Sequence, residues 1–478
     1  MVNRLYGITI AALLAIASIA CSKEEVNTFI VPSESILVAA PGEVGSTHFD
    51  SHNIASISAT TVPEGWVVNN IDMYSGTITV TAPSSFDNNE VMYGTIILKG
   101  YTPIGTTATV SIYVAILQNP TIDYCEAPAN CYIANKAATR YLFNPYIGGS
   151  ATPLETATIA LIWESPKDVI KYIDLKDGVA SFYILDTKDS DDNYTGLVKP
   201  GNALIGAYNA AGELIWSWHI WITNSDPTTD TITLGNSTLM NINLGANTNS
   251  EGSIDTSKIF ESYGLYYQWG RKEPIIGATD WKFSLNEDGK MYNTKGYNVK
   301  LSYESSSAEC GNSEWGALHP TTIITGNKDN GYDWLYEGHD DTLWSGSSKS
   351  ENDPCPAGWR IPDSSIYANL TISAESDNLP WQEAQKLYGW WLEDENADKF
   401  FFTAAGRRNY LDGRLDIVND DDIRPVPWSG YYWTATPDGE NATALYFDLN
   451  SSTRTWNAIN TSRAMHRANA LQVRCVKE

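Results

Sequence analysis

Short runs in which apolar and polar residues alternate dominate the chain from about residue 30 to residue 233. In SGTITVTAP (75–83), Ile78 and Val80 fall on one face of an extended strand and the threonines fall on the other. YGTIILKG (93–100) and ATVSIYVAIL (108–117) also read as strands, and clusters of Gly, Pro and Asn separate the runs. This pattern predicts a small β-sandwich over residues 30–118.

The predicted N-terminal sandwich resembles the immunoglobulin-like (Ig-like) and BACON modules found near the N-termini of Bacteroidetes surface lipoproteins. The resemblance implies a spacer that lifts the rest of the chain away from a membrane.

A second block of strands follows over residues 119–234. Its apolar runs are TIALIW (158–163), VASFYIL (179–185), NALIGAY (202–208) and LIWSWHIWIT (214–223). These predict a middle β-sandwich. The acidic stretch DSDDN (189–193) fails the EF-hand test, since Tyr194 stands where Gly is needed and Pro200 where Glu is needed. We therefore expect a solvated acidic loop there.

The stretch WSWHIW (216–221) is apolar on both faces of a strand. Such a strand is usually central and covered on both sides. A sugar-stacking platform would instead need exposed rings. We therefore expect Trp216 and Trp218 to be core residues. His219 has no His or Cys near it in sequence, and we expect it to be a hydrogen-bonded structural histidine.

The chain begins with a basic residue, Arg4, and an apolar run from Leu5 to Ala20. The run is too short to span a membrane and fits a secretory signal peptide over residues 1–20. SIAC (18–21) resembles a bacterial lipobox, although Ser18 stands where Leu is usual. The resemblance implies cleavage before Cys21 and acylation of that residue; the alternative is a plain cleaved signal.

A charged tether, residues 21–29, follows the lipobox. Its SKEE segment (22–25) resembles the signal that sends lipoproteins of Bacteroidetes-type bacteria to the outer face of the outer membrane. We therefore expect a lipid-anchored protein of the outer membrane that faces the cell exterior. The sequence contains no second apolar run of spanning length, so the lipid would be its only anchor.

Charge limits the partners of this chain of 478 residues. Loss of residues 1–20 removes Arg4 alone among the charged residues, and the net charge moves from −26 to −27. Such a chain repels nucleic acid phosphates, so no nucleic acid partner is expected. The sequence has no C-x-x-C motif and no His at zinc-ligand spacing from a Cys, so we expect no metal site.

The last half of the chain carries motifs spread over more than 200 positions. They are LMNINLGA (239–246), GLYYQWGRKEP (264–274), DPCPAGWRIPDSS (353–365), FFTAAGRRNYLDGRL (401–415), GYYWTAT (430–436) and SRAMHRANALQVRCVKE (462–478). In order and spacing they resemble the Fibrobacter succinogenes major paralogous domain, whose fold is C-type-lectin-like. The resemblance implies such a domain over residues 235–478, with a long insertion at 275–352.

The expected fold class is therefore multidomain and mainly β: an N-terminal Ig-like β-sandwich, a middle β-sandwich and a C-terminal α+β domain of C-type-lectin-like fold. Because chain ends lie close together in lectin-like folds, the resemblance also implies a disulfide between Cys355 and Cys475. A second candidate pair is Cys125 with Cys131, which would leave Cys310 free.

Enzymatic motifs are missing from the sequence. It has no G-x-S-x-G, no H-E-x-x-H and no phosphate-binding glycine loop. The formylglycine-generating enzymes, which share the lectin-like fold, need a close cysteine pair near the C-terminus, where this chain has Cys475 alone. The tripeptides of calcium-dependent lectins are also missing. We expect no catalytic residues, no cofactor and no enzyme.

The insertion at 275–352 contains DNGYDWLYEGHDDTLW (329–344). Long loops on a rigid scaffold often carry function. Its aromatic residues could stack on sugar rings while two aspartates accept hydroxyl hydrogen bonds; the alternative is that the rings fix the loop to the domain. The candidate ligand-binding residues are Tyr332, Trp334, Tyr336, Asp340, Asp341 and Trp344.

The sequence thus favours a surface-anchored binding or adhesion protein whose partner is an extracellular glycan or a host or matrix protein. It could also serve as an accessory or tip component of a surface fibre and contact fibre subunits. A structural or assembly protein without a ligand is the main alternative, and an enzyme of formylglycine-generating-like fold is the third.

Overall fold

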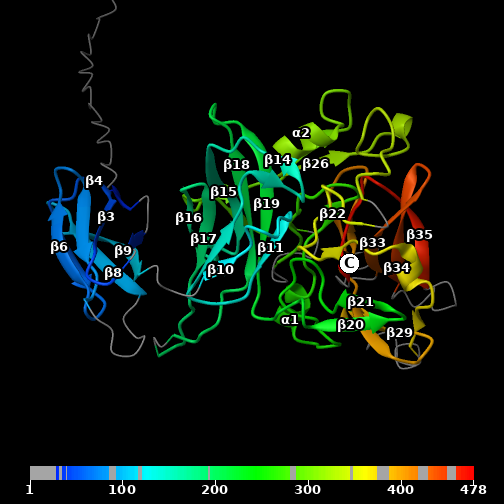
Figure 1. Cartoon of the computed structure of the whole chain (residues 1–478), viewed down its shortest axis with the longest axis horizontal. Coiled ribbons are helices and arrows are strands. Elements are labelled where there is room, and N and C mark those ends of the chain that lie inside the picture. The colour runs from blue at the N-terminus through cyan, green and yellow to red at the C-terminus, as the bar shows by residue number, and fades with distance from the viewer. Residues whose placement is uncertain are drawn as a thin grey trace, which may run out of the picture. The chain divides into compact units, whose positions relative to one another are not determined.

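The computed structural model describes residues 28–31, 35–38, 40–84, 93–116, 121–191, 194–279, 287–344, 348–373, 387–417, 429–448 and 459–478. The chain divides into two compact units (Figure 1): residues 1–118, here called the N-terminal unit, and residues 119–478, here called the main unit. The described residues are mainly in β-strands, as the sequence predicted.

Two facing sheets form the N-terminal unit. One sheet has the order β2-β9-β8-β5, the other has the order β3-β7-β6, and β1 pairs with β4. The alternating runs supply the core between the sheets, where Ile78, Val80, Ile96 and Leu98 are fully buried. The strands are β1 (Thr28–Ile30), β2 (Ser35–Val38), β3 (Val44–His48), β4 (Asp50–His52), β5 (Ser56–Thr61), β6 (Val67–Asp72), β7 (Thr77–Thr81), β8 (Tyr93–Tyr101) and β9 (Thr107–Ile116).

The first part of the main unit is also a β-sandwich. A sheet of order β10-β12-β17-β16 faces a larger sheet of order β11-β19-β18-β15-β23-β24 across an aromatic core. The strands are β10 (Thr121–Asp123), β11 (Cys131–Ala134), β12 (Thr139–Phe143), β15 (Thr158–Ser165), β16 (Lys171–Lys176), β17 (Val179–Ile184), β18 (Gly201–Tyr208), β19 (Leu214–Ile222), β23 (Met291–Tyr292) and β24 (Asn298–Val299). A short hairpin, β13 (Ile147–Gly148) with β14 (Thr152–Pro153), lies outside these sheets.

Strand β19 carries the WSWHIW stretch and lies inside the larger sheet, paired with β11 and β18. Trp216 and Trp218 face the core of the sandwich, and Trp221 faces a second core on the other side of the sheet. The expectation that these rings are core residues is confirmed. Ile215 differs from the expected alternation: a bulge opposite Tyr208 turns it to the same core as Trp216.

His219 is buried, and its Nε2 lies 2.8 Å from Asn202 Oδ1. Because the amide nitrogen of Asn202 donates to the Gly245 carbonyl, its oxygen is the acceptor and Nε2 carries the proton. The Tyr267 hydroxyl then donates to Nδ1 at 3.4 Å. Burial lowers the pKa of His219 to about 3, so the ring is neutral at physiological pH. It is the hydrogen-bonded structural histidine that the sequence predicted.

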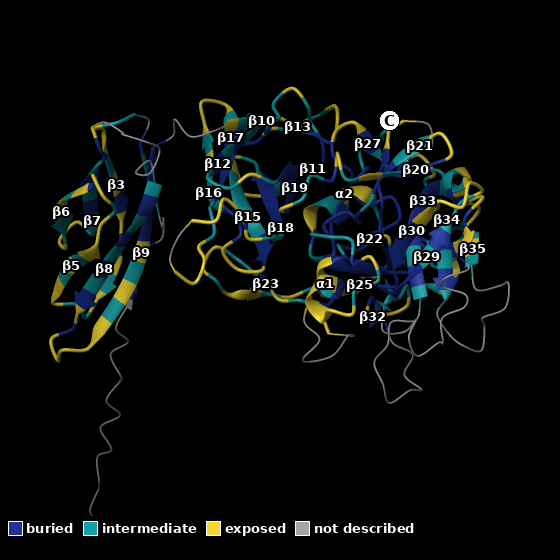
Figure 2. Ribbon diagram, turned by 90° about the horizontal axis from the view of Figure 1, so that it is seen from below, coloured by how far each residue is buried: buried dark blue, intermediate teal, exposed yellow. Residues whose placement is uncertain are grey.

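The second part of the main unit contains several small sheets and short helices (Figure 2), with buried positions concentrated along their facing sides. The sheets have the orders β20-β21-β37-β27, β22-β36-β31-β32, β28-β29-β30, β33-β34-β35 and β25-β26. Their strands are β20 (Thr231–Leu234), β21 (Ser237–Met240), β22 (Tyr267–Gln268), β25 (Ser302–Ser305), β26 (Thr322–Thr325), β27 (Trp359–Arg360), β28 (Thr371–Ile372), β29 (Gly389–Glu393), β30 (Lys399–Thr403), β31 (Arg407–Arg408), β32 (Leu415–Asp416), β33 (Ser429–Asp438), β34 (Asn441–Asp448), β35 (Ile459–His466), β36 (Ala470–Leu471) and β37 (Val476–Lys477). The helices are α1 (Thr256–Glu261), α2 (Ser313–Leu318), η1 (Lys328–Asn330) and η2 (Ser364–Tyr367).

One continuous core joins the two parts of the main unit. It contains Trp163 and Trp221 from the sandwich together with Trp269, Trp433 and Leu471 from the second part. Strand β23 of the predicted insertion extends the larger sandwich sheet by pairing with β15. Residues 119–234 and 235–478 therefore form a single compact unit.

Buried charges of the GRKEP motif also join these two parts. The Lys272 ammonium donates to the Ser217 carbonyl of β19 at 3.1 Å and lies 2.9 Å from the Glu273 carboxylate. Arg271 donates to that carboxylate at 3.2 Å and to the Gly316 carbonyl of α2 at 3.0 Å. Because all three charged side chains are almost fully buried, each needs the others to offset its desolvation.

A disulfide joins Cys355 and Cys475, the pair that the family resemblance implied. The second candidate pair is not formed: Cys125 and Cys131 are both free thiols, as is Cys310. The reason is local. Cys131 begins β11, and its side chain points into the continuous core, whereas Cys125 precedes the strand and is partly exposed. Burial raises the pKa of Cys125 to about 12, so its thiol is protonated at neutral pH.

Candidate functional site

The predicted ligand-binding loop holds its two tryptophans inside the protein. Trp334 and Trp344 are each 1% exposed, and their indole nitrogens donate to the carbonyls of Trp269 and Asn352. Neither ring can stack on a sugar. The prediction that they contact a ligand is wrong; the alternative, that the rings fix the loop to the domain, describes them correctly.

The other loop candidates do not form one binding surface with them. Tyr336 is exposed, and Tyr332 packs edge-on against Tyr410. The Asp340 carboxylate accepts a hydrogen bond from the Thr342 hydroxyl. Asp341 pairs with the buried guanidinium of Arg467.

An acid–base pair that the sequence analysis missed lies within this loop. The fully buried Asp333 carboxylate lies 2.7 Å from Nδ1 of His339 and 3.9 Å from Nε of Arg467. Burial raises the pKa of Asp333, although its partners oppose the rise. These contacts hold the loop in place, and the local sequence gives no signal for them because the Asp333 carboxylate is buried by tertiary contacts.

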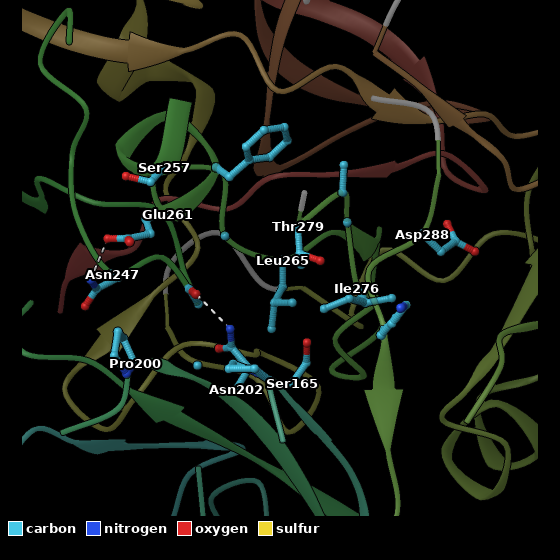
Figure 3. A pocket seen from close by; sticks show the side chains of 18 of the residues that line it. Ser165, Pro200, Asn202, Asn247, Ser257, Glu261, Leu265, Ile276, Thr279 and Asp288 are labelled. Carbon is cyan, nitrogen blue, oxygen red and sulfur yellow. Dashed lines mark hydrogen bonds between the residues drawn. The ribbon is translucent and has the colours of Figure 1, made fainter. Parts of the chain in front are cut away.

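A groove of about 880 Å³ lies in the main unit. Figure 3 shows three groups of side chains around it. Ser257 and Glu261 come from helix α1, Ser165 and Asn202 come from β15 and β18 of the sandwich, and Asp288 comes from the predicted insertion. The groove therefore lies where the sandwich meets the second part of the main unit.

The lining of the groove is mixed. Leu265 and Ile276 contribute buried apolar surface, and Phe260 of α1 adds a half-buried ring that packs edge-on against Tyr263. Gly245, at φ 86°, approaches Leu265 so closely that a Cβ would meet that side chain at 2.7 Å. Any larger residue at that position would collide with the groove wall.

Carboxylates outnumber cations among the described lining residues, which include Glu261, Glu287 and Asp288 but only one cation, Lys290. Glu261 accepts from the Asn247 amide at 2.9 Å through one carboxylate oxygen, which leaves the other oxygen to a ligand. Glu287 is an exposed carboxylate of the lining, and the hydroxyls of Thr256 and Thr279 can accept as well as donate. Asn202 is not available, since both its amide atoms are used by His219 and Gly245. The rim thus suits a ligand rich in hydroxyl donors.

Sequence reasoning missed the groove because its residues come from segments more than 100 positions apart. A signal was present in part: Gly264 and Leu265 of the GLYYQWGRKEP motif and residues 276–279 of the insertion line it. Neither segment indicates by itself that it lies beside β15 and β18.

In the part of the chain that the structure describes, no group of three or more His, Cys, Asp or Glu side chains is placed to hold a metal ion. No helix among the same residues is long and apolar enough to cross a bilayer. Cys21 and the rest of the predicted signal peptide lie outside the described residues.

No family model matches the chain, and a search of curated proteins finds no match. Solved structures that match include a chimeric titin Z1Z2 carrying a peptide from decorin (16% identity, 41% of this chain, 95% of that chain, TM-score 0.15). Another is the D00-D0 domain of intimin (9% identity, 41% of this chain, 96% of that chain, TM-score 0.17). A third is the SGBP-B protein of the Bacteroides ovatus mixed-linkage glucan utilization locus in complex with a mixed-linkage heptasaccharide (10% identity, 41% of this chain, 44% of that chain, TM-score 0.13). TM-scores this low carry no argument about fold or function.

Proposed function

We propose that this chain is a lipoprotein of the bacterial outer membrane that faces the cell exterior and binds an extracellular glycan. The groove of the main unit is the binding site. The observation that carries the proposal is its lining: an apolar floor with a half-buried phenyl ring beneath a rim rich in acceptors. Apolar surface packs against the C–H face of a sugar ring, and carboxylates and hydroxyls orient its hydroxyl groups.

The lipobox and the SKEE segment support the anchoring part of this proposal, as does the net charge of −26, which keeps a chain soluble outside the cell. The resemblance of residues 235–478 to the Fibrobacter succinogenes major paralogous domain supports a binding role rather than catalysis. The experiments below also test two other ligands: a host or matrix protein, and a subunit of a surface fibre.

A glycan array probed with the chain from residue 22 onward tests the binding site. We expect a hit whose affinity falls at least tenfold in Ser257→Trp, which places an indole in the groove from an exposed position of α1. Phe260→Ala should also weaken binding. Tyr336→Ala is the matched control, since Tyr336 is exposed on the loop at 329–344 and should leave the affinity unchanged.

Loss of binding in Tyr336→Ala with no change in Ser257→Trp would overturn the groove as the site. Turnover of any arrayed polysaccharide would overturn the proposal of a binding protein. Binding to matrix proteins or fibre subunits, with none to glycans, would replace the proposed ligand.

A further inference from the structure

The strand order assigns each turn of the N-terminal unit to one of its two ends. Asp72 of β6 pairs with Thr77 of β7, so the turn at 73–76 lies at one end of that sheet. His48, the last residue of β3, pairs with the same Thr77. Strand β3 therefore ends beside this turn.

The turn of the second hairpin lies at the same end. Tyr101 of β8 pairs with Thr107 of β9 across the turn at 102–106. The ring of Phe29 packs against Gly100 of β8 and lies 5.9 Å from the ring of Phe49, whose backbone nitrogen donates to the Gly76 carbonyl. These contacts bring the turns at 73–76 and 102–106 together. We call this the proximal end of the N-terminal unit.

Large apolar side chains are exposed at the proximal end. Tyr74 is fully exposed and Ile104 is 82% exposed, each at the tip of its turn, and Ile30 of β1 is 52% exposed. Figure 2 shows exposed positions at the free end of the β8–β9 hairpin. The opposite end of the unit exposes Val44 and Val67, but less fully, so Tyr74 and Ile104 are the most exposed large apolar side chains among the described residues of this unit.

The chain enters the unit at this same end. Thr28, the first residue of β1, pairs with His52. Three residues after His52, Ala55 donates its backbone N–H to the carbonyl of Tyr101, which borders the turn at 102–106. Only six residues, 22–27, separate Cys21 from Thr28, the first residue of β1. The seven Cα–Cα steps between them span about 25 Å at most, so an acyl chain on Cys21 would hold the proximal end within that distance of the bilayer. Strand β9 runs away from this end and finishes at Ile116, at the opposite end of its sheet.

We infer that the proximal end rests on the bilayer that holds the acylated Cys21, with Tyr74 and Ile104 inserted at the lipid–water interface. Tyrosine is enriched at this interface because its ring is apolar and its hydroxyl remains hydrated. A covalent lipid and a second apolar contact together hold a protein more firmly than either alone. This inference rests on the lipid anchoring proposed above.

Nitroxide labels on vesicle-bound protein test the inference. A hexahistidine tag in place of residues 1–21 holds the chain on phosphatidylcholine vesicles that contain a nickel-chelating lipid, so acylation is not needed. In a Cys125→Ser background, a label is placed at Ile104→Cys. The control label is at Val44→Cys, since Val44 is also exposed but pairs with Thr81, at the opposite end of the sheet from the turn at 73–76.

Oxygen concentrates in lipid, and a water-soluble nickel chelate is excluded from it. We expect the ratio of the nitroxide's collisions with oxygen to its collisions with the chelate to rise several-fold at residue 104 on vesicles. The ratio should stay unchanged at residue 44. Equal ratios at the two sites would overturn the inference. Shielding of residue 104 without vesicles, increasing with protein concentration, would overturn it as well, because a second copy would then cover this end.

A separate measurement tests the anchor. Cys21→Ala should move the protein from the membrane fraction of cells to the soluble fraction. If it does not, the proposed anchoring fails whatever the labels report, and if it does while the labels show no insertion, only the contact of the proximal end with lipid is wrong.

Discussion

Lys272 shows how a single buried charge depends on its neighbours. Its ammonium lies 4.2 Å from the centre of the Trp216 ring and is paired with the Glu273 carboxylate. Burial lowers the pKa of Lys272, and the adjacent carboxylate opposes that shift. The 2.9 Å contact forms an ion pair inside the protein, where breaking it leaves a buried charge uncompensated.

Lys272→Met should accordingly lower the free energy of unfolding of the main unit by about 3 kcal/mol. Lys295→Met, at an exposed position, should change it by less than about 0.5 kcal/mol. Urea unfolding followed by tryptophan fluorescence measures both, since every tryptophan except Trp66 lies in the main unit. Similar changes in the free energy of unfolding for the two substitutions would contradict the buried ion pair of Lys272 and Glu273.

His219 gives a prediction for pH. Its pKa in the folded protein is about 3, below the ordinary histidine value of 6.5, so the unfolded chain binds the proton first as the pH falls. The stability that neutral His219 contributes is complete above pH 6.5 and is lost between pH 6.5 and 3. From pH 6.5 to 4.5 the free energy of unfolding should fall about 2 kcal/mol further in the wild type than in His219→Gln. Parallel pH profiles would show that the ring titrates normally.

Strand β19 illustrates the scale of the element. It lies between β11 and β18 and is covered on both faces, so its tryptophans belong to two cores instead of a binding platform. The loop at 329–344 follows the same rule, because an indole that finds a backbone carbonyl inside the protein is held there. Aromatic residues are frequent at ligand sites and in cores, and burial decides between the two.

Trp334→Ala should therefore act on stability. Removal of the buried indole should lower the free energy of unfolding by about 3–5 kcal/mol. Tyr336→Ala, two residues further on and exposed, should change it by less than about 0.5 kcal/mol. Chemical denaturation of the two variants tests this, and a Trp334→Ala protein of normal stability would mean that the ring is not packed as the structure shows.

At the scale of the whole molecule, the continuous core predicts cooperativity. Leu204 of β18 and Trp433 of β33 lie in the same core, although they come from parts of the chain that the sequence assigned to separate domains. The disulfide between Cys355 and Cys475 closes a loop of 120 residues in the second part. Loss of either the core contact or the disulfide should therefore destabilise the main unit as one body.

Calorimetry can test that cooperativity. Leu204→Ala should lower the free energy of unfolding by about 3 kcal/mol, and the paired substitution Cys355→Ala with Cys475→Ala should lower it by about 4 kcal/mol. Both should shift one and the same transition of the main unit. Two separate transitions, each moved by only one variant, would show that residues 119–234 and 235–478 unfold independently.

The order of apolar and polar residues determined most strands of both sandwiches. The runs at 93–100, 158–163 and 214–223 coincide with strands. Alternation of apolar and polar residues is a property of a single strand, so it can be recognised without knowing which strand pairs with it. The same pattern indicated that WSWHIW is buried. The motifs that contain Cys355 and Cys475 indicated the disulfide, because they resemble those of a family with a C-type-lectin-like fold. The strands and the burial of WSWHIW follow from the local order of residues, whereas the disulfide follows from the resemblance to a family.

Tertiary structure alone decided which surfaces are exposed. It buried Trp334 and Trp344, joined two expected domains through one core, and brought β15, β18, α1 and residues 276–279 around a groove. It also placed Tyr74 and Ile104 at the end where the tether enters. Burial and convergence depend on contacts between residues far apart in the chain, and local periodicity contains no information about them.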